Sequence, residues 1–110
     1  RYVAHFDTTP APDAESLMRS RYTAFVLERA DYLLATWAPA KRPSQVRFDP
    51  GAKWLGLEVR AFAESDSDHA TVEFVARQRE ATGRAIRLHE RSRFVRENDR
   101  WYYLDGDIAP

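Results

Sequence analysis

Two carboxylates, Glu90 and Asp105, interrupt apolar segments near the end of this 110-residue chain. Glu90 lies between Leu88 and Phe94 in RLHERSRF, where alternating polarity predicts a half-buried strand. A buried carboxylate without a partner destabilises a fold by several kcal/mol, so each acid needs a cation, hydrogen-bond donors or water. The two acids therefore indicate either a structural ion pair or a polar site inside the protein.

Acid–base chemistry would use these side chains in a pocket. Glu90 or Asp105 would act as the general base. Tyr103 would donate a hydrogen bond to a developing oxyanion, and Arg21 would anchor an anionic group. The matching reaction is proton abstraction next to a carbonyl, as in isomerases and dehydratases. The simpler interpretation is an ion-pair network that closes the interior and carries no reaction.

Other chemistries find less support in the sequence. Cysteine is absent, which removes thiol nucleophiles, disulfides and thiolate metal sites. The three histidines, His5, His69 and His89, are far apart and lack the spacing of metal ligands, so we expect no metal and no cofactor. Seventeen basic and seventeen acidic residues give zero net charge, which argues against non-specific nucleic-acid binding. No signal peptide or membrane-spanning run is visible, and we expect a cytoplasmic location.

Arg21 belongs to a predicted helix over residues 14–28, for which Asp13 is a good N-cap. At 100° per residue one face of this helix collects six side chains: Ala14, Leu17, Met18, Arg21, Tyr22 and Phe25. A second short helix, 32–37, would be capped by Asp31. Residues 38–53 predict an irregular connection with a brief strand at 46–48.

From Trp54 onward the polarity alternates with a period of two. Strands are predicted at 54–63, 70–79, 85–96 and 100–105. Helices followed by an antiparallel meander are typical of an α+β fold with the helices on one face of the sheet. We expect one domain over 13–110, with 1–12 as an extended lead-in.

Turn chemistry predicts which strand residues face each other. A two-residue turn at Asn98-Asp99 places Phe94 opposite Tyr103 and Ser92 opposite Asp105. A three-residue loop, 81–83, places Phe74 opposite Glu90 and Glu73 opposite Arg91. The inner face would then hold five candidate pocket or ion-pair residues besides Arg21 of the helix: Glu90, Ser92, Trp101, Tyr103 and Asp105. Our hypothesis is that Arg21 pairs with Glu90 or Asp105.

The predicted outer face of the sheet is strongly basic. It carries five candidate interaction residues: Arg77, Arg87, His89, Arg91 and Arg93. They form a candidate docking surface for an acidic protein partner or for a second copy of the chain, giving a homodimer through the sheet. No aromatic base-stacking platform accompanies the arginines, which argues against RNA.

Six segments in order, SLMRSRYTAFV, DYLLATW, WLGLEV, TVEFVA, LHERSRFV and WYYLDGD, resemble the middle domain of the YchJ-like uncharacterised proteins. The resemblance implies a nuclear transport factor 2-like cone, in which N-terminal helices pack on a curved antiparallel sheet of about four strands. Such proteins commonly carry SEC-C motifs, which are Cys-rich zinc-binding segments. This sequence has no cysteine, so zinc binding is carried over to none of its residues.

The sequence thus leaves three hypotheses for function. The first is a module that binds a small ligand or a protein partner, with an inner polar site. The second is a pocket enzyme of isomerase or dehydratase type, and the third is a scaffold for SEC-C segments missing here. The resemblance supplies no reaction that would separate them.

Overall fold

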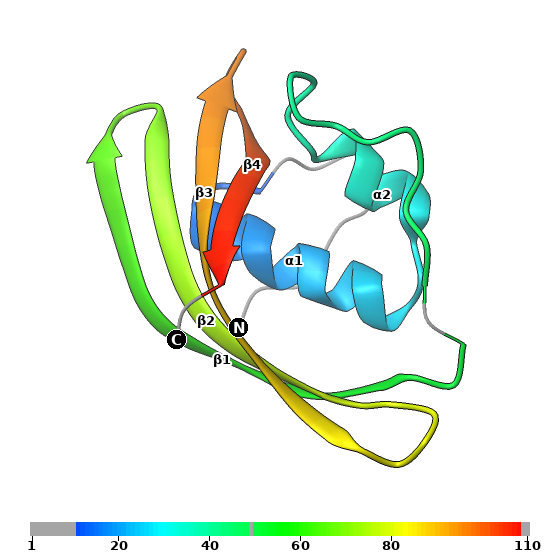
Figure 1. Cartoon of the computed structure of the whole chain (residues 1–110). Coiled ribbons are helices and arrows are strands. Elements are labelled where there is room, and N and C mark those ends of the chain that lie inside the picture. Colours follow the sequence, from blue (N-terminus) through cyan, green and yellow to red (C-terminus); the bar gives the residue numbers. More distant parts are fainter. Residues whose placement is uncertain (1–10, 49, 109–110) are drawn as a thin grey trace.

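The computed structural model describes residues 11–48 and 50–108. Most of the predicted lead-in, 1–12, lies outside these described residues. Within the described residues, two helices precede four strands (Figure 1): α1 (Ala14–Val26), α2 (Ala30–Ala35), β1 (Lys53–Asp66), β2 (His69–Arg79), β3 (Ala85–Glu97) and β4 (Arg100–Ile108). The predicted α+β arrangement of helices on an antiparallel sheet is confirmed.

Helix α1 begins where its capping residue predicts. The Asp13 side chain accepts a hydrogen bond from Ser16 N at 2.7 Å, and Glu15 lies in the first turn. The helix ends at Val26, two residues before the predicted end, and Glu28 then takes a positive φ of 55°. Its buried face is Ala14, Leu17, Met18, Ser20, Arg21 and Ala24.

Helix α2 differs from its prediction at both ends. It begins at Ala30 after the N-cap residue Arg29, so Asp31 lies in the first turn and is not the cap. It ends at Ala35, and residues 36–38 then run beside β4. Tyr103 N donates to Thr36 O, and Ala38 N donates to Tyr103 O, both at 2.8 Å. The brief strand predicted at 46–48 is absent; Val46 and Phe48 instead pack on a small core of Ala24, Tyr32 and Leu33.

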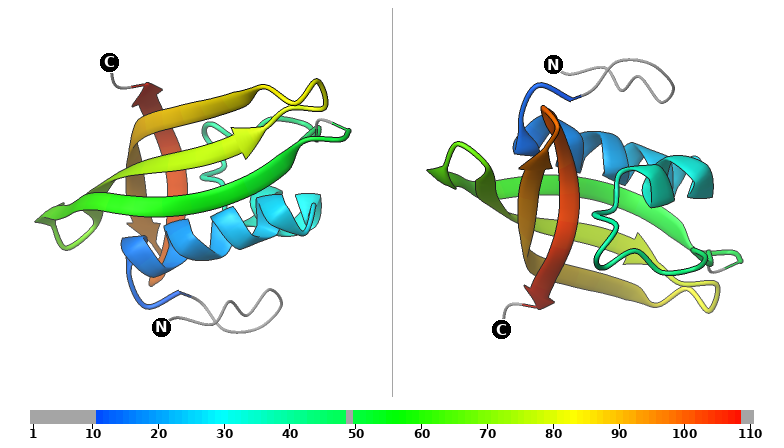
Figure 2. Two further views of the ribbon diagram at one scale, coloured as in Figure 1. Left: turned by 90° about the horizontal axis from the view of Figure 1, so that it is seen from below. Right: turned by 90° about the horizontal axis from the view of Figure 1, so that it is seen from above.

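The four strands form one antiparallel sheet in the order β1-β2-β3-β4, and the sheet curves around α1 (Figures 1 and 2). Asn98 and Asp99 have φ of 53° and 63°, as a primed hairpin turn requires. The 81–83 loop closes through a 2.8 Å bond from Glu80 N to Arg84 O. The predicted β2–β3 register is confirmed, with Phe74 opposite Glu90 and Glu73 opposite Arg91.

The predicted pairing of β3 with β4 is confirmed near the turn and is wrong farther from it. Phe94 faces Tyr103 as predicted, but a β-bulge follows, and Arg93 faces Asp105. One extra residue in a strand moves every later side chain to the other face. Asp105 therefore lies on the outer face, and Gly106 takes the predicted place of Asp105 opposite Ser92.

The main core lies between α1 and the concave face of the sheet. Its buried members are Ala11, Ala14, Leu17, Met18, Ala70, Val72, Phe94 and Trp101. Helix α2 is tied to α1 by a bond of 2.7 Å between the hydroxyls of Ser20 and Tyr32. The space beside the C-terminal half of α1 is lined differently, and it holds the candidate site.

Candidate ligand-binding pocket

A cavity of about 260 Å³ lies between α1 and the concave face of the sheet. Its lining comes from α1, the segment after α2, and all four strands: Met18, Arg21, Tyr22, Phe25, Trp37, Trp54, Leu57, Phe74, Ala76, Leu88, Glu90, Ser92, Phe94 and Tyr103. Most of these side chains are apolar or aromatic. The cavity lies on the concave side of the curved sheet, next to α1 (Figures 1 and 2).

Aromatic rings form the wall near the end of α1. Tyr22 and Phe25 lie one helical turn apart, and their ring centroids are 5.7 and 5.9 Å from that of Trp54 at the start of β1. These edge-on and tilted contacts are favourable geometries for aromatic pairs. They give the cavity a rigid apolar side.

Arg21 is the buried cation of the cavity, with 6% of its surface exposed. Its Nη1 donates to Leu33 O at 2.8 Å and to Thr36 Oγ1 at 2.7 Å. Its guanidinium carbon lies 4.7 Å from the ring centre of Tyr103 and 5.2 Å from that of Trp37. Loss of solvent lowers the Arg21 pKa to about 10, so the side chain is still charged at neutral pH.

The predicted pairing of Arg21 with a carboxylate is wrong. In the described part of the chain Arg21 makes no ion pair. The carbonyl groups in the last turn of a helix lack intrahelical partners, and α2 presents one of them, Leu33 O, to the guanidinium. The partners of Arg21 are therefore the carbonyl of Leu33 at the end of α2 and the hydroxyl of Thr36, and not the predicted Glu90 or Asp105.

Glu90 is the acid of the cavity and has hydroxyl partners. Its Oε2 accepts from Ser92 Oγ at 2.6 Å and from Tyr103 OH at 3.3 Å. Gly106 lies directly against this carboxylate, and a Cβ at that position would overlap Oε2. Burial and the nearby Glu90 charge raise the pKa of Tyr103, so its phenol stays a proton donor.

Four of the six predicted inner residues meet in the cavity: Arg21, Glu90, Ser92 and Tyr103. The other two lie elsewhere. Trp101 is in the packed core, 6% exposed, with the Arg96 guanidinium 5.7 Å from its ring centre. Asp105 is on the outer face, where Arg93 Nε donates to it at 2.5 Å.

Trp37 is a lining residue that sequence reasoning missed. Its ring centre lies 5.2 Å from that of Tyr103, and the two residues form a parallel bridge. Among the described residues, Trp37 Nε1 is the buried side-chain polar atom without a hydrogen-bond partner. The available signal was an aromatic residue at the end of DYLLATW, but no local pattern predicts pairing with a strand more than sixty residues later.

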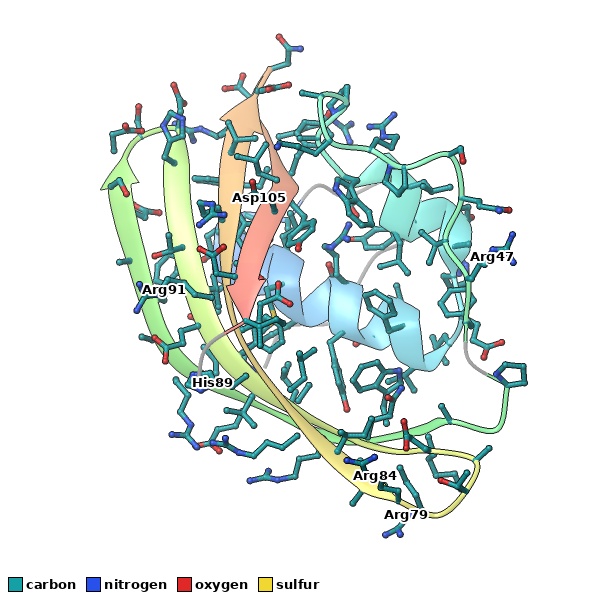
Figure 3. The ribbon with its side chains drawn as sticks, in the orientation of Figure 1. Arg47, Arg79, Arg84, His89, Arg91 and Asp105 are labelled. Carbon is teal, nitrogen blue, oxygen red and sulfur yellow. The ribbon has the colours of Figure 1, made fainter. Side chains whose placement is uncertain are left out.

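The outer face balances most of its charge within the sheet. His89 Nε2 lies 2.7 Å from Glu73 Oε2, and Arg91 lies 3.5 Å from the same carboxylate group. The hydrogen bond from His89 is the main cause that lowers the Glu73 pKa. Figure 3 shows His89 and Arg91 on the convex side of the sheet, away from α1.

Two arginines of this face lack such balance. Arg77 and Arg87 face each other across β2 and β3, and neither forms an ion pair with any residue that the structure describes. Arg93, in contrast, also reaches Asp107, at 2.7 Å. The predicted basic surface is thus confined to the part of the sheet near the 81–83 loop.

Within residues 11–48 and 50–108, no three His, Asp or Glu side chains are grouped to hold a metal ion. None of the described helices is both long and apolar enough to cross a bilayer.

A helix cradled by a curved four-stranded meander, with a mostly apolar pocket between them, defines a nuclear transport factor 2-like domain. The family model described as "YchJ, middle NTF2-like domain" matches residues 13–106. The chain belongs to this family, whose members include the proteins named UPF0225. The family and fold predicted from the sequence are both confirmed.

Two relatives and one solved structure show the extent of the similarity. The chain is 67% identical over 107 residues to a UPF0225 protein of Polaromonas sp., covering 97% of this chain and 77% of that protein. It is 51% identical over 109 residues to a UPF0225 protein of Chromobacterium violaceum, covering 94% and 79%. The solution structure of a SEC-C motif containing protein from Rhodopseudomonas palustris matches with a TM-score of 0.82 and 35% identity, covering 94% of this chain and 84% of that one.

Proposed function

We propose that this domain binds a small organic molecule in the cavity between α1 and the sheet. The observation that carries the proposal is a mostly apolar cavity that holds a buried cation, Arg21, and an acid, Glu90, which do not pair with each other. Protein interiors are close-packed, so a void of this size is a departure from ordinary packing. Apolar walls with a few convergent polar groups are typical of ligand sites.

The size of the cavity limits the ligand. Pockets for drug-sized molecules span about 300–1,000 Å³, and this cavity is about 260 Å³. The ligand is therefore a small metabolite-like compound with an apolar body. Its polar groups would meet Arg21 or Glu90, and its body would contact the aromatic wall.

The test uses a variant that fills the cavity. Ala76, on β2, lines the cavity and is 2% exposed, so Ala76→Leu places a larger side chain in that space. Ala61 is exposed on the neighbouring strand, and Ala61→Leu is the matched control. With indole and 3-phenylpropionate as probes, we expect NMR shift changes at lining residues of the wild type and of Ala61→Leu, and their loss in Ala76→Leu. Shift changes that Ala76→Leu leaves intact would contradict the proposal.

A second candidate function is acid–base catalysis in the same cavity. It is favoured by the contact of Glu90 Oε2 with the phenol of Tyr103, which puts a base and a hydrogen-bond donor side by side in the cavity. Glu90 is the base in this proposal, since Asp105 lies on the other face. The test is deuterium exchange at C3 of 4-phenyl-2-butanone in D₂O. Faster exchange with the wild type than with Glu90→Gln supports catalysis, and equal rates contradict it.

A further inference from the structure

The guanidinium of Arg21 has one occupied nitrogen and one free edge. Both of its hydrogen bonds leave from Nη1, to Leu33 O and Thr36 Oγ1. Nε and Nη2 have no hydrogen-bond acceptor among the residues that the structure describes. These two nitrogens form one edge of the planar group, and that edge is the fork that binds both oxygens of a carboxylate in parallel.

The two nitrogens of the free edge are not sealed inside the protein. Trp37 Nε1 is the side-chain polar atom in the described ranges that is both sealed and unpartnered, so the free Arg21 nitrogens are not sealed. Arg21 itself lines the cavity. Unsealed, unpaired nitrogens on a lining residue are the groups that a molecule in the cavity would meet.

The fork is held in place before any ligand arrives. The rings of Trp37 and Tyr103 lie against the guanidinium, and the two bonds of Nη1 fix its rotation. A donor group that is already oriented loses little conformational entropy when a ligand binds. Burial also strengthens a charge-assisted hydrogen bond relative to one in water.

The acid of the cavity does not occupy this fork. Glu90 directs Oε2 to the hydroxyls of Ser92 and Tyr103, and these donors stabilise its charge. Among the described residues, Arg21 thus has hydrogen-bond acceptors at one nitrogen and no anion in contact. A second anionic group on a ligand would share the cavity with Glu90 and be repelled.

We infer that the pocket takes a small organic monocarboxylate with an apolar, ring-sized body. The carboxylate accepts from Nε and Nη2 of Arg21, and the body packs against Phe25, Trp54 and Phe74. This inference rests on the proposed function, because it names the ligand class of the same cavity.

Three probes of similar shape test the inference on the unaltered protein. They are 3-phenylpropionate, its neutral amide 3-phenylpropionamide, and the dicarboxylate phenylsuccinate, each titrated by NMR at pH 7. We expect the monocarboxylate to bind about tenfold more tightly than either other probe, the gain of one charge-assisted pair. Equal binding of acid and amide overturns the inference and leaves the cavity proposal standing. Binding of none of the three overturns the inference, and it overturns the cavity proposal as well when indole also fails to bind.

A conservative variant gives a second, independent readout. Arg21→Lys keeps the charge and loses the fork, so we expect about tenfold weaker binding of 3-phenylpropionate and unchanged binding of the amide. Arg87→Lys makes the same exchange on the outer face and is the control. A melting curve and an NMR spectrum check that each variant folds; should Arg21→Lys fail to fold, the acid-to-amide ratio of the wild type decides. Unchanged affinity for the acid in folded Arg21→Lys overturns the inference.

Discussion

Gly106 lies where any larger residue would displace the acid of the cavity. A Cβ there would overlap Glu90 Oε2 and lie 2.9 Å from Glu90 Cδ and 3.2 Å from Arg91 O. The neighbour on one side is backbone, so only the carboxylate is able to move away. Glu90 would then lose its bond to Ser92 Oγ.

The first prediction is that Gly106→Ala destabilises the protein by about 1–3 kcal/mol through this overlap. Removing the carboxylate should relieve most of the effect, so Gly106→Ala in a Glu90→Ala background should be much milder. Urea unfolding of the four proteins gives the coupling energy, expected to be about 1 kcal/mol in size. Additive effects of the two substitutions would show that Gly106 serves the strand and not the position of Glu90.

The second prediction concerns alkaline pH. Burial and Glu90 raise the Tyr103 pKa, so the folded chain keeps this proton at a pH where an unfolded tyrosine, with a pKa of about 10, releases it. The unfolded state then binds fewer protons, and the free energy of unfolding falls as the pH rises above about 10. Tyr103→Phe should flatten that decline in urea unfolding from pH 9 to 11. Arg21, whose lowered pKa acts in the opposite sense, is present in both proteins, and Tyr103 is one of the groups that oppose the lowering of its pKa.

Single residues show where the sequence was informative about the site and where it was not. Helical periodicity placed Arg21 on the inner face, and strand alternation placed Glu90 and Tyr103 there. The partners of Arg21 were not predictable, because Leu33 O is a backbone atom and every residue has one. The pattern of side chains in a sequence does not indicate which carbonyl at a helix end will accept a hydrogen bond from a buried side chain.

At the scale of elements, the β2–β3 hairpin contains one unfavourable pair. Arg77 and Arg87 are directly opposite, and like charges in that position repel. The third prediction is that Arg87→Glu stabilises the fold by about 0.2–1 kcal/mol, since it replaces repulsion by attraction. Urea unfolding at low and high salt measures the gain, which should shrink with salt. A gain of equal size for Arg87→Gln would exclude a new ion pair as the cause.

The turn residues correctly predicted which strand residues pair next to each turn. The bulge in β4 made the prediction fail farther along β3 and β4. Asn98-Asp99 and Gly83 adopt the positive φ values that their hairpins require, and pairing follows correctly from both turns. The bulge beyond Tyr103 adds one residue to β4 without a proline or glycine at Leu104 to mark it. Asp105 consequently moved from the predicted site to an ion pair with Arg93 on the outer face.

At the scale of the molecule, α1 packs against a filled core at its start and borders a cavity at its end. The first turns of α1 pack with Ala70 and Val72 of β2 in the main core, and its later turns border the cavity with Ala76 of the same strand. Ala70 and Ala76 are each 2% exposed, and both point to the concave face. Exposure alone therefore does not distinguish the packed region from the open one.

The fourth prediction compares the same change, Ala→Leu, at one position in the packed core and at one position beside the cavity. Ala70→Leu adds three carbons to a packed core and should destabilise by about 1–3 kcal/mol through overpacking. Ala76→Leu adds the same carbons where the cavity has room for them, so its free energy of unfolding should be close to that of the wild type or above it. Thermal and urea unfolding of both variants measure the difference. Equal destabilisation would mean that the cavity is not open space in solution, and the ligand proposals would lose their basis.

A different result would connect the packing to the proposed function. If Ala76→Leu is tolerated and also abolishes probe binding, the space beside the later turns of α1 is a binding site that the fold does not need to fill for its stability.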